Sequence, residues 1–226
     1  MDWDLAIDRN RDALRRIVAA LFALAGLAGG GPVSTLPRHV YAAVMHVLRP
    51  AEAAVRRLIF IAARGLVLNP RVTRPVPAGL PAFSAAGAFR GPAFSLLDPL
   101  KHFTIDHFDH TAGAIPHNSF FRVYDEDFLA SPPALSPDEP VDAAPLILRL
   151  QSLRRALSDL PRQARRLARW RARRDFLLQR KGPFRPMRLS PIRPGPPPGR
   201  RARAIHEVDH VLRECHGLAL DVMNTS

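Results

Sequence analysis

The chain has 226 residues, of which 47% are hydrophobic, and it carries a formal net charge of +13 at pH 7. This length allows one domain of ordinary size, or a smaller domain with long tails. The single cysteine, Cys215, excludes an intramolecular disulfide and leaves no cysteine pair of the zinc-binding type. Such cysteine usage is typical of a reducing compartment, so we expect a cytoplasmic protein.

The positive charge is concentrated in one quarter of the chain. Between Arg149 and Arg203 there are seventeen arginines, one lysine and only two acids, whereas acids slightly outnumber bases in the rest of the sequence. A GC-rich coding bias can explain why arginine outnumbers lysine 31 to 2, but it would not confine the excess to one segment. A local field of this sign favours an anionic partner, either a polymer or a membrane.

The distribution of apolar residues and prolines predicts an all-α fold of short amphipathic helices joined by long, largely disordered proline-rich segments. Twelve of the 23 prolines lie between Pro70 and Pro145, and seven lie between Pro183 and Pro198. We expect five regions: an apolar helical region (1–68), an irregular or disordered region rich in proline and aromatics (69–145), an arginine-rich helical region (146–181), a proline- and arginine-rich linker (182–203) and a C-terminal amphipathic helix (204–226).

Three helices are predicted in the N-terminal region. Apolar spacing indicates a first helix over residues 2–28, a second that starts near Pro37 and is ended or kinked by Pro50, and a third over residues 51–68. Together they would form a small helical hairpin or three-helix unit. The second half of the first helix is apolar on nearly all sides, so it needs cover from a partner helix or from lipid.

A secretory signal or a single membrane span is the alternative interpretation of the uncharged stretch from Ile17 to Pro37. Glycines 29 to 31 and Pro32 interrupt this stretch after about thirteen apolar residues. At 1.5 Å per residue these reach roughly 20 Å, well short of the ~30 Å hydrocarbon core of a bilayer. A soluble helical unit is therefore the first expectation.

The two proline-rich segments differ in their aromatic content. Nine of the sixteen aromatic residues lie between Phe83 and Phe128, which suggests extended segments that dock onto another surface, with disorder as the alternative. Residues 182–203 contain no such cluster, and we expect them to act as a semi-rigid spacer between helices.

Leucines recur at coiled-coil spacing from Leu146 to Leu167. The Leu160-Pro161 pair predicts that one helix stops there and a second starts, with proline in its first turn. The same spacing of three and four returns between Ile205 and Val222, so Cys215 is expected to pack in an apolar seam rather than to react.

The arginine-rich helical region is the strongest functional candidate. Its arginines surround a single tryptophan that could stack on a base or lie at a lipid interface, and arginine pairs with phosphate through two parallel hydrogen bonds. The candidate anion-binding residues are Arg154, Arg155, Arg162, Arg165, Arg166, Arg169, Trp170, Arg171, Arg173 and Arg174.

Two clusters of histidines in the sequence are candidate metal sites. His206 and His210 fit the H-E-x-x-H pattern of zinc hydrolases, but Asp209 puts a charge where such motifs carry none, and both histidines lie off the apolar seam. The run from His102 to His117 is richer in histidine and aspartate but has no evident rigid scaffold. We expect hydrogen-bonded surface or loop residues in both cases, and no bound metal.

No arrangement typical of a serine or cysteine triad or of a phosphate-binding loop occurs, so we expect a non-enzymatic protein without a cofactor. The first expected function is binding of nucleic acid or of an acidic protein surface through the arginine-rich segment. The alternative is peripheral membrane association, in which the apolar N-terminal helix or a single short span anchors the chain and the basic segment contacts anionic lipid. Helix–helix self-association is a further expectation.

Overall fold

The structure is a computed structural model that describes residues 2–27, 33–68, 93–99, 136–179 and 188–225. Across these ranges the fold is all-α, as predicted. Its five helices are α1 (Trp3–Leu24), α2 (Arg38–Ala62), α3 (Ala144–Ser158), α4 (Leu160–Gln179) and α5 (Glu207–Asn224). Two short strands, β1 (Thr35–Pro37) and β2 (Pro140–Asp142), pair antiparallel with Leu36 opposite Val141.

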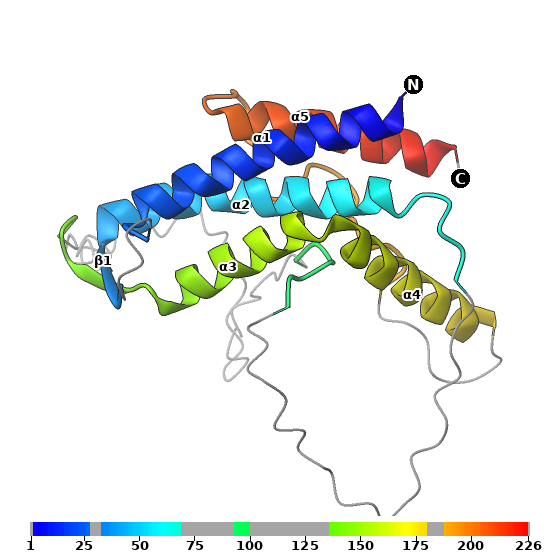
Figure 1. The fold of residues 1–226 in the computed structure, drawn as a ribbon, viewed down its shortest axis with the longest axis horizontal. Coiled ribbons are helices and arrows are strands. Elements are labelled where there is room, and N and C mark those ends of the chain that lie inside the picture. Colours follow the sequence, from blue (N-terminus) through cyan, green and yellow to red (C-terminus); the bar gives the residue numbers. More distant parts are fainter. Residues whose placement is uncertain (1, 28–32, 69–92, 100–135, 180–187, 226) are drawn as a thin grey trace, which may run out of the picture.

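Helix α2 lies at the centre of the fold. It contacts the other four helices, with α1 and α5 on one side and α3 and α4 on the other (Figure 1). Every residue from Ala51 to Ile61 is buried, including two arginines and one glutamate. Helices from the predicted N-terminal, arginine-rich and C-terminal regions therefore share one hydrophobic core.

The prediction of a separate third helix after Pro50 is wrong, because one continuous helix runs from Arg38 to Ala62 with Pro50 inside it. Proline normally interrupts a helix because it cannot donate to the carbonyl four residues earlier. Here that carbonyl belongs to His46, and it accepts a hydrogen bond from Arg201 Nη2 at 2.5 Å instead. Burial of the following helical turns against four neighbours also favours continuation.

Helix α1 buries its apolar face within the protein. Leu14, Ile17, Val18 and Leu21 are at most 7% exposed. The Asp2 carboxylate caps the start by accepting from the amides of Asp4 and Leu5, both at 3.1 Å. The apolar surface of α1 is therefore covered by neighbouring helices of the same chain. Among the described residues, no helix is long and apolar enough to cross a membrane.

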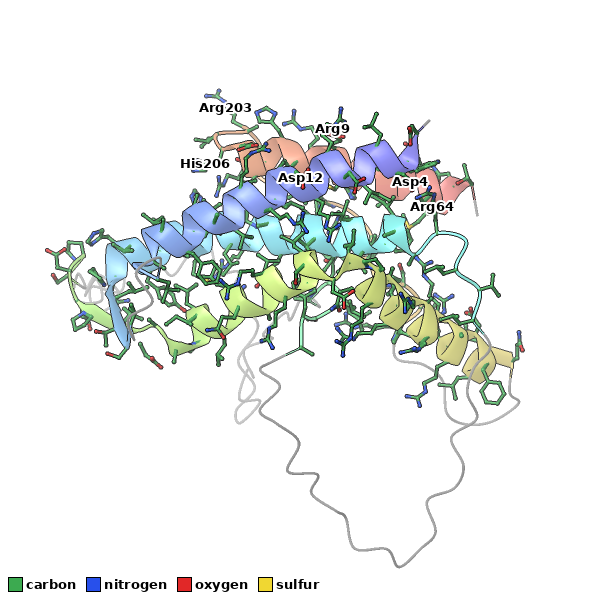
Figure 2. All side chains as sticks on the ribbon, in the orientation of Figure 1. Asp4, Arg9, Asp12, Arg64, Arg203 and His206 are labelled. Atoms are coloured by element: carbon green, nitrogen blue, oxygen red, sulfur yellow. The ribbon has the colours of Figure 1, made fainter. Side chains whose placement is uncertain are left out.

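The start of α1 is joined to the end of α2 near both chain termini. Asp4 and Arg64 lie together there (Figure 2), with Arg64 Nη2 3.4 Å from the aspartate Oδ1. The same guanidinium lies over the Trp3 ring, 5.1 Å from its centroid. This exposed contact links the start of α1 to the residues that follow α2.

The predicted break between α3 and α4 is confirmed. Helix α3 ends at Ser158, α4 begins at Leu160, and the Asp159 carboxylate accepts from the Arg162 amide at 3.2 Å. The residues predicted at coiled-coil spacing form a buried row that we call the leucine seam. All of them are at most 4% exposed: Leu146, Leu150, Leu153, Leu157, Leu160, Ala164 and Leu167. Cys215 is likewise fully buried on α5, and burial raises the pKa of its thiol to about 12.

Residues 93–99 of the predicted irregular region (69–145) dock onto the helices. Its last residues, 136–145, run into β2 and the start of α3, which the prediction of irregular structure missed, and residues 69–92 and 100–135 lie outside the described residues. Phe94 is 5% exposed and Asp98 is 2% exposed. The Asp98 amide donates to the carbonyl of Pro191 at 2.9 Å, so this segment also contacts the chain that precedes α5. The described part of the predicted spacer, residues 188–203, therefore packs against the core through Ile192.

A buried ionic network holds this docked segment. Arg57, which is fully buried, donates from Nη2 to Asp98 Oδ2 at 3.0 Å. Arg56 lies 3.4 Å from Glu52, and Arg149 on α3 donates to the same glutamate at 2.9 Å. Burial lowers the pKa of Arg56 and of Arg57, against the opposing effect of the carboxylates. Removing one partner of such a pair would leave an uncompensated buried charge.

Candidate anion-binding site on α4

The ten predicted anion-binding residues lie on two helices. Arg154 and Arg155 belong to the exposed side of α3, and the other eight belong to α4. Helix α4 contains seven arginines and one acid, Asp175. The structure separates the eight α4 residues into a group that turns toward the protein and a group that faces outward.

Arg171 and Arg174 form part of the protein's own packing. The Arg171 guanidinium lies 4.3 Å from the centroid of the Phe60 ring and donates to the carbonyl of Ala63 at 3.3 Å, at the end of α2. Burial and then the nearby Arg174 lower its pKa. Arg174 pairs with Asp175 at 2.6 Å and donates to the carbonyl of Leu189. Both cations are already engaged within the chain.

Trp170 and Arg166 are also partly engaged. Trp170 is half-buried against the core, and Arg174 lies 5.5 Å from the centroid of its ring. Arg166 donates to Gln163 Oε1 at 2.5 Å and more weakly to the carbonyl of Phe94 at 3.4 Å. The ring that the sequence suggested as a stacking surface therefore has a guanidinium of its own chain over it.

On α3, Arg154 and Arg155 are exposed but have local contacts. The Arg154 guanidinium lies 4.6 Å from the centroid of the Phe22 ring on α1. Arg155 donates from Nε to the carbonyl of Gln151 at 3.3 Å, one helical turn earlier. Arg154 therefore lies at the α1–α3 contact, and both arginines belong to α3 rather than to the outer side of α4.

The remaining four arginines form what we call the α4 stripe: Arg162, Arg165, Arg169 and Arg173. All four are exposed, and within the described ranges no hydrogen bond or ion pair of their guanidinium groups is found. Their spacing of three, four and four residues places them on one helical face, along about 16 Å of helix. The opposite face carries the buried leucine seam.

Like charges at this spacing are unfavourable for an isolated helix. Each pair of arginines three or four residues apart destabilises the helix by about 0.2–0.5 kcal/mol through charge repulsion. No carboxylate lies on the stripe to offset this repulsion. An anion that bridges neighbouring guanidinium groups would remove this repulsion and gain charge-assisted hydrogen bonds. The stripe is thus an outward-facing row of like charges, and no hydrogen bond or ion pair within the described residues ties its guanidinium groups to the rest of the fold.

The two histidines of the H-E-x-x-H pattern are exposed, as predicted. His206 precedes α5 as its N-cap residue, and His210 lies in its first turn. Asp209 between them is buried and engaged: its Oδ2 accepts from Arg201 Nη1 at 3.1 Å and from the His206 amide at 3.0 Å. Burial alone would raise the pKa of Asp209, but these hydrogen bonds and Arg201 lower it. The cluster from His102 to His117 lies outside the described residues.

The described residues contain no group of three or more histidine, cysteine or carboxylate side chains placed to hold a metal ion. The described residues thus form a small all-α protein with an outward-facing arginine stripe on α4. Comparison with protein-family models, with curated proteins and with solved structures finds no match for this chain.

Proposed function

We propose that the protein is a non-enzymatic nucleic-acid-binding protein and that the α4 stripe is its contact surface. The observation that carries this proposal is the alignment of four exposed guanidinium groups without a carboxylate partner in the described ranges. Each strand of a duplex carries one phosphate per ~3.4 Å of helix axis, so a stripe of about 16 Å is long enough for each of its four arginines to face a phosphate. Guanidinium groups suit this partner because they bind phosphate through paired hydrogen bonds.

An anionic membrane is the weaker candidate because the apolar face that runs along α4 is buried, and the large apolar side chain that the helix exposes is Leu178 near its end. An interfacial helix inserts an apolar face among the lipids while its basic residues contact the headgroups. In α4 that face consists of Leu160, Ala164, Leu167 and Ala168, all of which are buried in the core. The apolar face of α1 is buried as well. The large apolar side chains that these helices expose, Leu5 and Leu24 on α1 and Leu178 on α4, are separated from one another rather than aligned on one helical face.

An acidic protein surface would also attract the stripe, but it would not supply a regular row of anions.

A competition experiment distinguishes these partners. Fluorescence anisotropy with a labelled 20-nucleotide duplex and a labelled single strand, at salt concentrations from 50 to 300 mM, would give the dependence of affinity on salt. With four phosphates neutralised, we expect log K to fall with log salt with a slope of about −3.6 for the duplex and −2.8 for the single strand.

Two controls make this experiment decisive. Polyglutamate serves as an acidic polymer without phosphates, and vesicles containing phosphatidylserine serve as a membrane. Displacement of the oligonucleotide by polyglutamate at equal charge concentration, or tighter binding to the vesicles, would reject nucleic acid as the preferred partner. Absence of salt-dependent oligonucleotide binding would reject the proposal altogether.

A further inference from the structure

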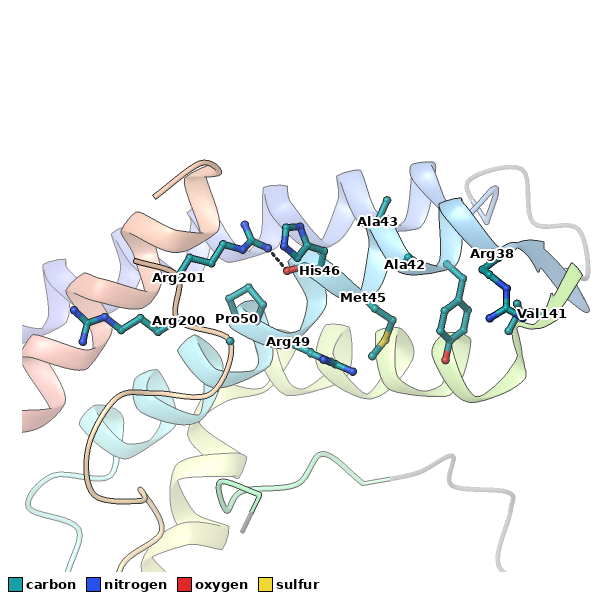
Figure 3. A pocket seen from close by; sticks show the side chains of 12 residues that line it. Arg38, Ala42, Ala43, Met45, His46, Arg49, Pro50, Val141, Arg200 and Arg201 are labelled. Atoms are coloured by element: carbon teal, nitrogen blue, oxygen red, sulfur yellow. Dashed lines mark hydrogen bonds between the residues drawn. The ribbon is translucent and has the colours of Figure 1, made fainter. Parts of the chain in front are cut away.

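A second surface lies on the N-terminal half of α2, away from α4. Here one side of the helix is left uncovered by the five described helices, and it forms an open groove of about 820 Å³ (Figure 3). One end of the groove is closed by residues 199–201, which cross α2 at Pro50, and the other end lies near Val141 of β2. Small-molecule sites commonly have volumes of about 300–1,000 Å³.

Close backbone contact builds the wall at Pro50. Gly199 has a φ of +78°, and a Cβ atom placed on it would lie 2.7 Å from the Pro50 nitrogen. Only glycine allows this approach. Arg201 then holds the crossing segment in place through its hydrogen bond to the carbonyl of His46, drawn in Figure 3. The groove is therefore a structured part of the fold.

The middle of the groove is apolar. Ala42 and Ala43 are exposed and small, which makes the helix surface hollow between the larger Tyr41 and His46. Met45 lies between them, partly buried. Apolar contacts in such a hollow would shield the non-polar part of a ligand from water.

The described residues that line the groove give it a positive charge, since they include four arginines and one histidine and none of them is acidic. Two of its arginines are neutralised by carboxylates: Arg38 pairs with Glu139 at 2.7 Å, and Arg201 pairs with Asp209 at 3.1 Å. Arg49 is exposed, and the described part of the chain offers its guanidinium no acid or hydrogen-bond acceptor. Its side chain runs along the groove beside Met45 (Figure 3).

We propose that this groove binds a small organic anion with an apolar body, such as a carboxylate or phosphate ester of a short aliphatic chain. Arg49 pairs with the anionic group, and the hollow at Ala42, Ala43 and Met45 receives the apolar body. This site shares no residue with the α4 stripe. Each proposal can therefore fail while the other stands.

Octanoate is a suitable probe because it combines one carboxylate with a short aliphatic chain. Titration of the full chain, followed by isothermal calorimetry and by the NMR shifts of the Met45 methyl group, would show saturable binding. Octanol and octylamine, which have the same chain without the negative charge, should bind at least tenfold more weakly. Equal binding of octanol, or no saturable binding of octanoate, would overturn the proposal.

Two substitutions test the two parts of the site. Arg49→Gln should weaken octanoate binding about fivefold to tenfold, since a charge-assisted hydrogen bond is lost. Ala42→Leu should abolish it by filling the hollow, and circular dichroism checks that this variant folds. The charge-matched control Arg213→Gln, on exposed α5 surface, and the stripe variant Arg165→Gln/Arg169→Gln should bind octanoate like the parent. Equal weakening by Arg213→Gln and Arg49→Gln would refute a site at Arg49.

Discussion

Arg201 donates from Nη2 to the main-chain carbonyl of His46 at 2.5 Å. This carbonyl is the acceptor that Pro50, four residues later, leaves without a helical donor. Through Nη1 the same guanidinium binds Asp209 Oδ2 at 3.1 Å, and its side chain is only 14% exposed. One residue of the proline- and arginine-rich segment thus connects the centre of α2 to the start of α5.

Replacing Arg201 by alanine should destabilise the fold by about 2–4 kcal/mol, because it leaves a buried carboxylate unpaired and a helix carbonyl unsatisfied. Urea unfolding followed by circular dichroism measures this loss. Because Pro50→Ala returns a helical donor to the His46 carbonyl, the cost of Arg201→Ala should be smaller in that background. Identical costs in both backgrounds would mean that Arg201 does not compensate for the proline.

Gly199→Ala should be more harmful than the matched substitution Gly195→Ala. Both glycines have positive φ, +78° and +81°, so alanine strains either backbone by about 1–2 kcal/mol. Only at Gly199 would the new Cβ also meet the backbone at Pro50, whereas nothing lies within 4 Å at Gly195. We expect a further loss of about 1–3 kcal/mol for Gly199→Ala, measured by urea unfolding. Equal losses would show that residues 199–201 do not pack on α2.

The free energy of unfolding should depend on pH through His216. Arg57 Nε donates to His216 Nδ1 at 3.2 Å, and only a neutral imidazole can accept this bond. Burial, followed by the charges of Arg57 and Arg200, lowers the pKa of His216 below its ordinary value of 6.5. The unfolded chain therefore takes up this proton first, so the contribution to stability is complete above pH 6.5 and declines as the pH falls below it.

His216→Gln should flatten this dependence, because the glutamine carbonyl can accept from Arg57 without titrating. Urea midpoints at about pH 7.5 and pH 5.5 provide the comparison. His210→Gln, at an exposed position on the same helix, is the control and should leave the slope unchanged. A His216→Gln slope equal to that of the parent would exclude this histidine as the source.

Helical spacing was sufficient to predict much of the fold. The leucines from Leu146 to Leu167 identified the buried side of α3 and α4, and the Leu160-Pro161 pair located the break between them. The continuation of α2 through Pro50 was not predictable in this way. The donor to the His46 carbonyl is Arg201, which lies 155 positions away in the sequence. Nor did local pattern show that Arg57 would be fully buried, since its partner Asp98 lies in a segment without periodicity.

The sequence located the candidate site on the arginine-rich helices, but the predicted set of residues included arginines that contact the protein's own core. At about 100° per residue, Arg171 and Arg174 fall on the same side as the leucine seam, so helical geometry already indicated that they would turn inward. The same geometry places the α4 stripe on the opposite side. What the sequence could not supply was the identity of the inward partners, because the Phe60 ring reaches Arg171 through tertiary packing alone.

The salt dependence of oligonucleotide binding in two charge-matched double variants tests the central claim most directly. Arg165→Gln/Arg169→Gln removes two charges from the α4 stripe, and Arg203→Gln/Arg213→Gln removes two exposed charges elsewhere. If the stripe contacts phosphates, the slope of log K against log salt becomes shallower by about 1.8 in the first variant and is unchanged in the second. Equal changes in both variants would show that binding follows net charge alone and would contradict a site on α4.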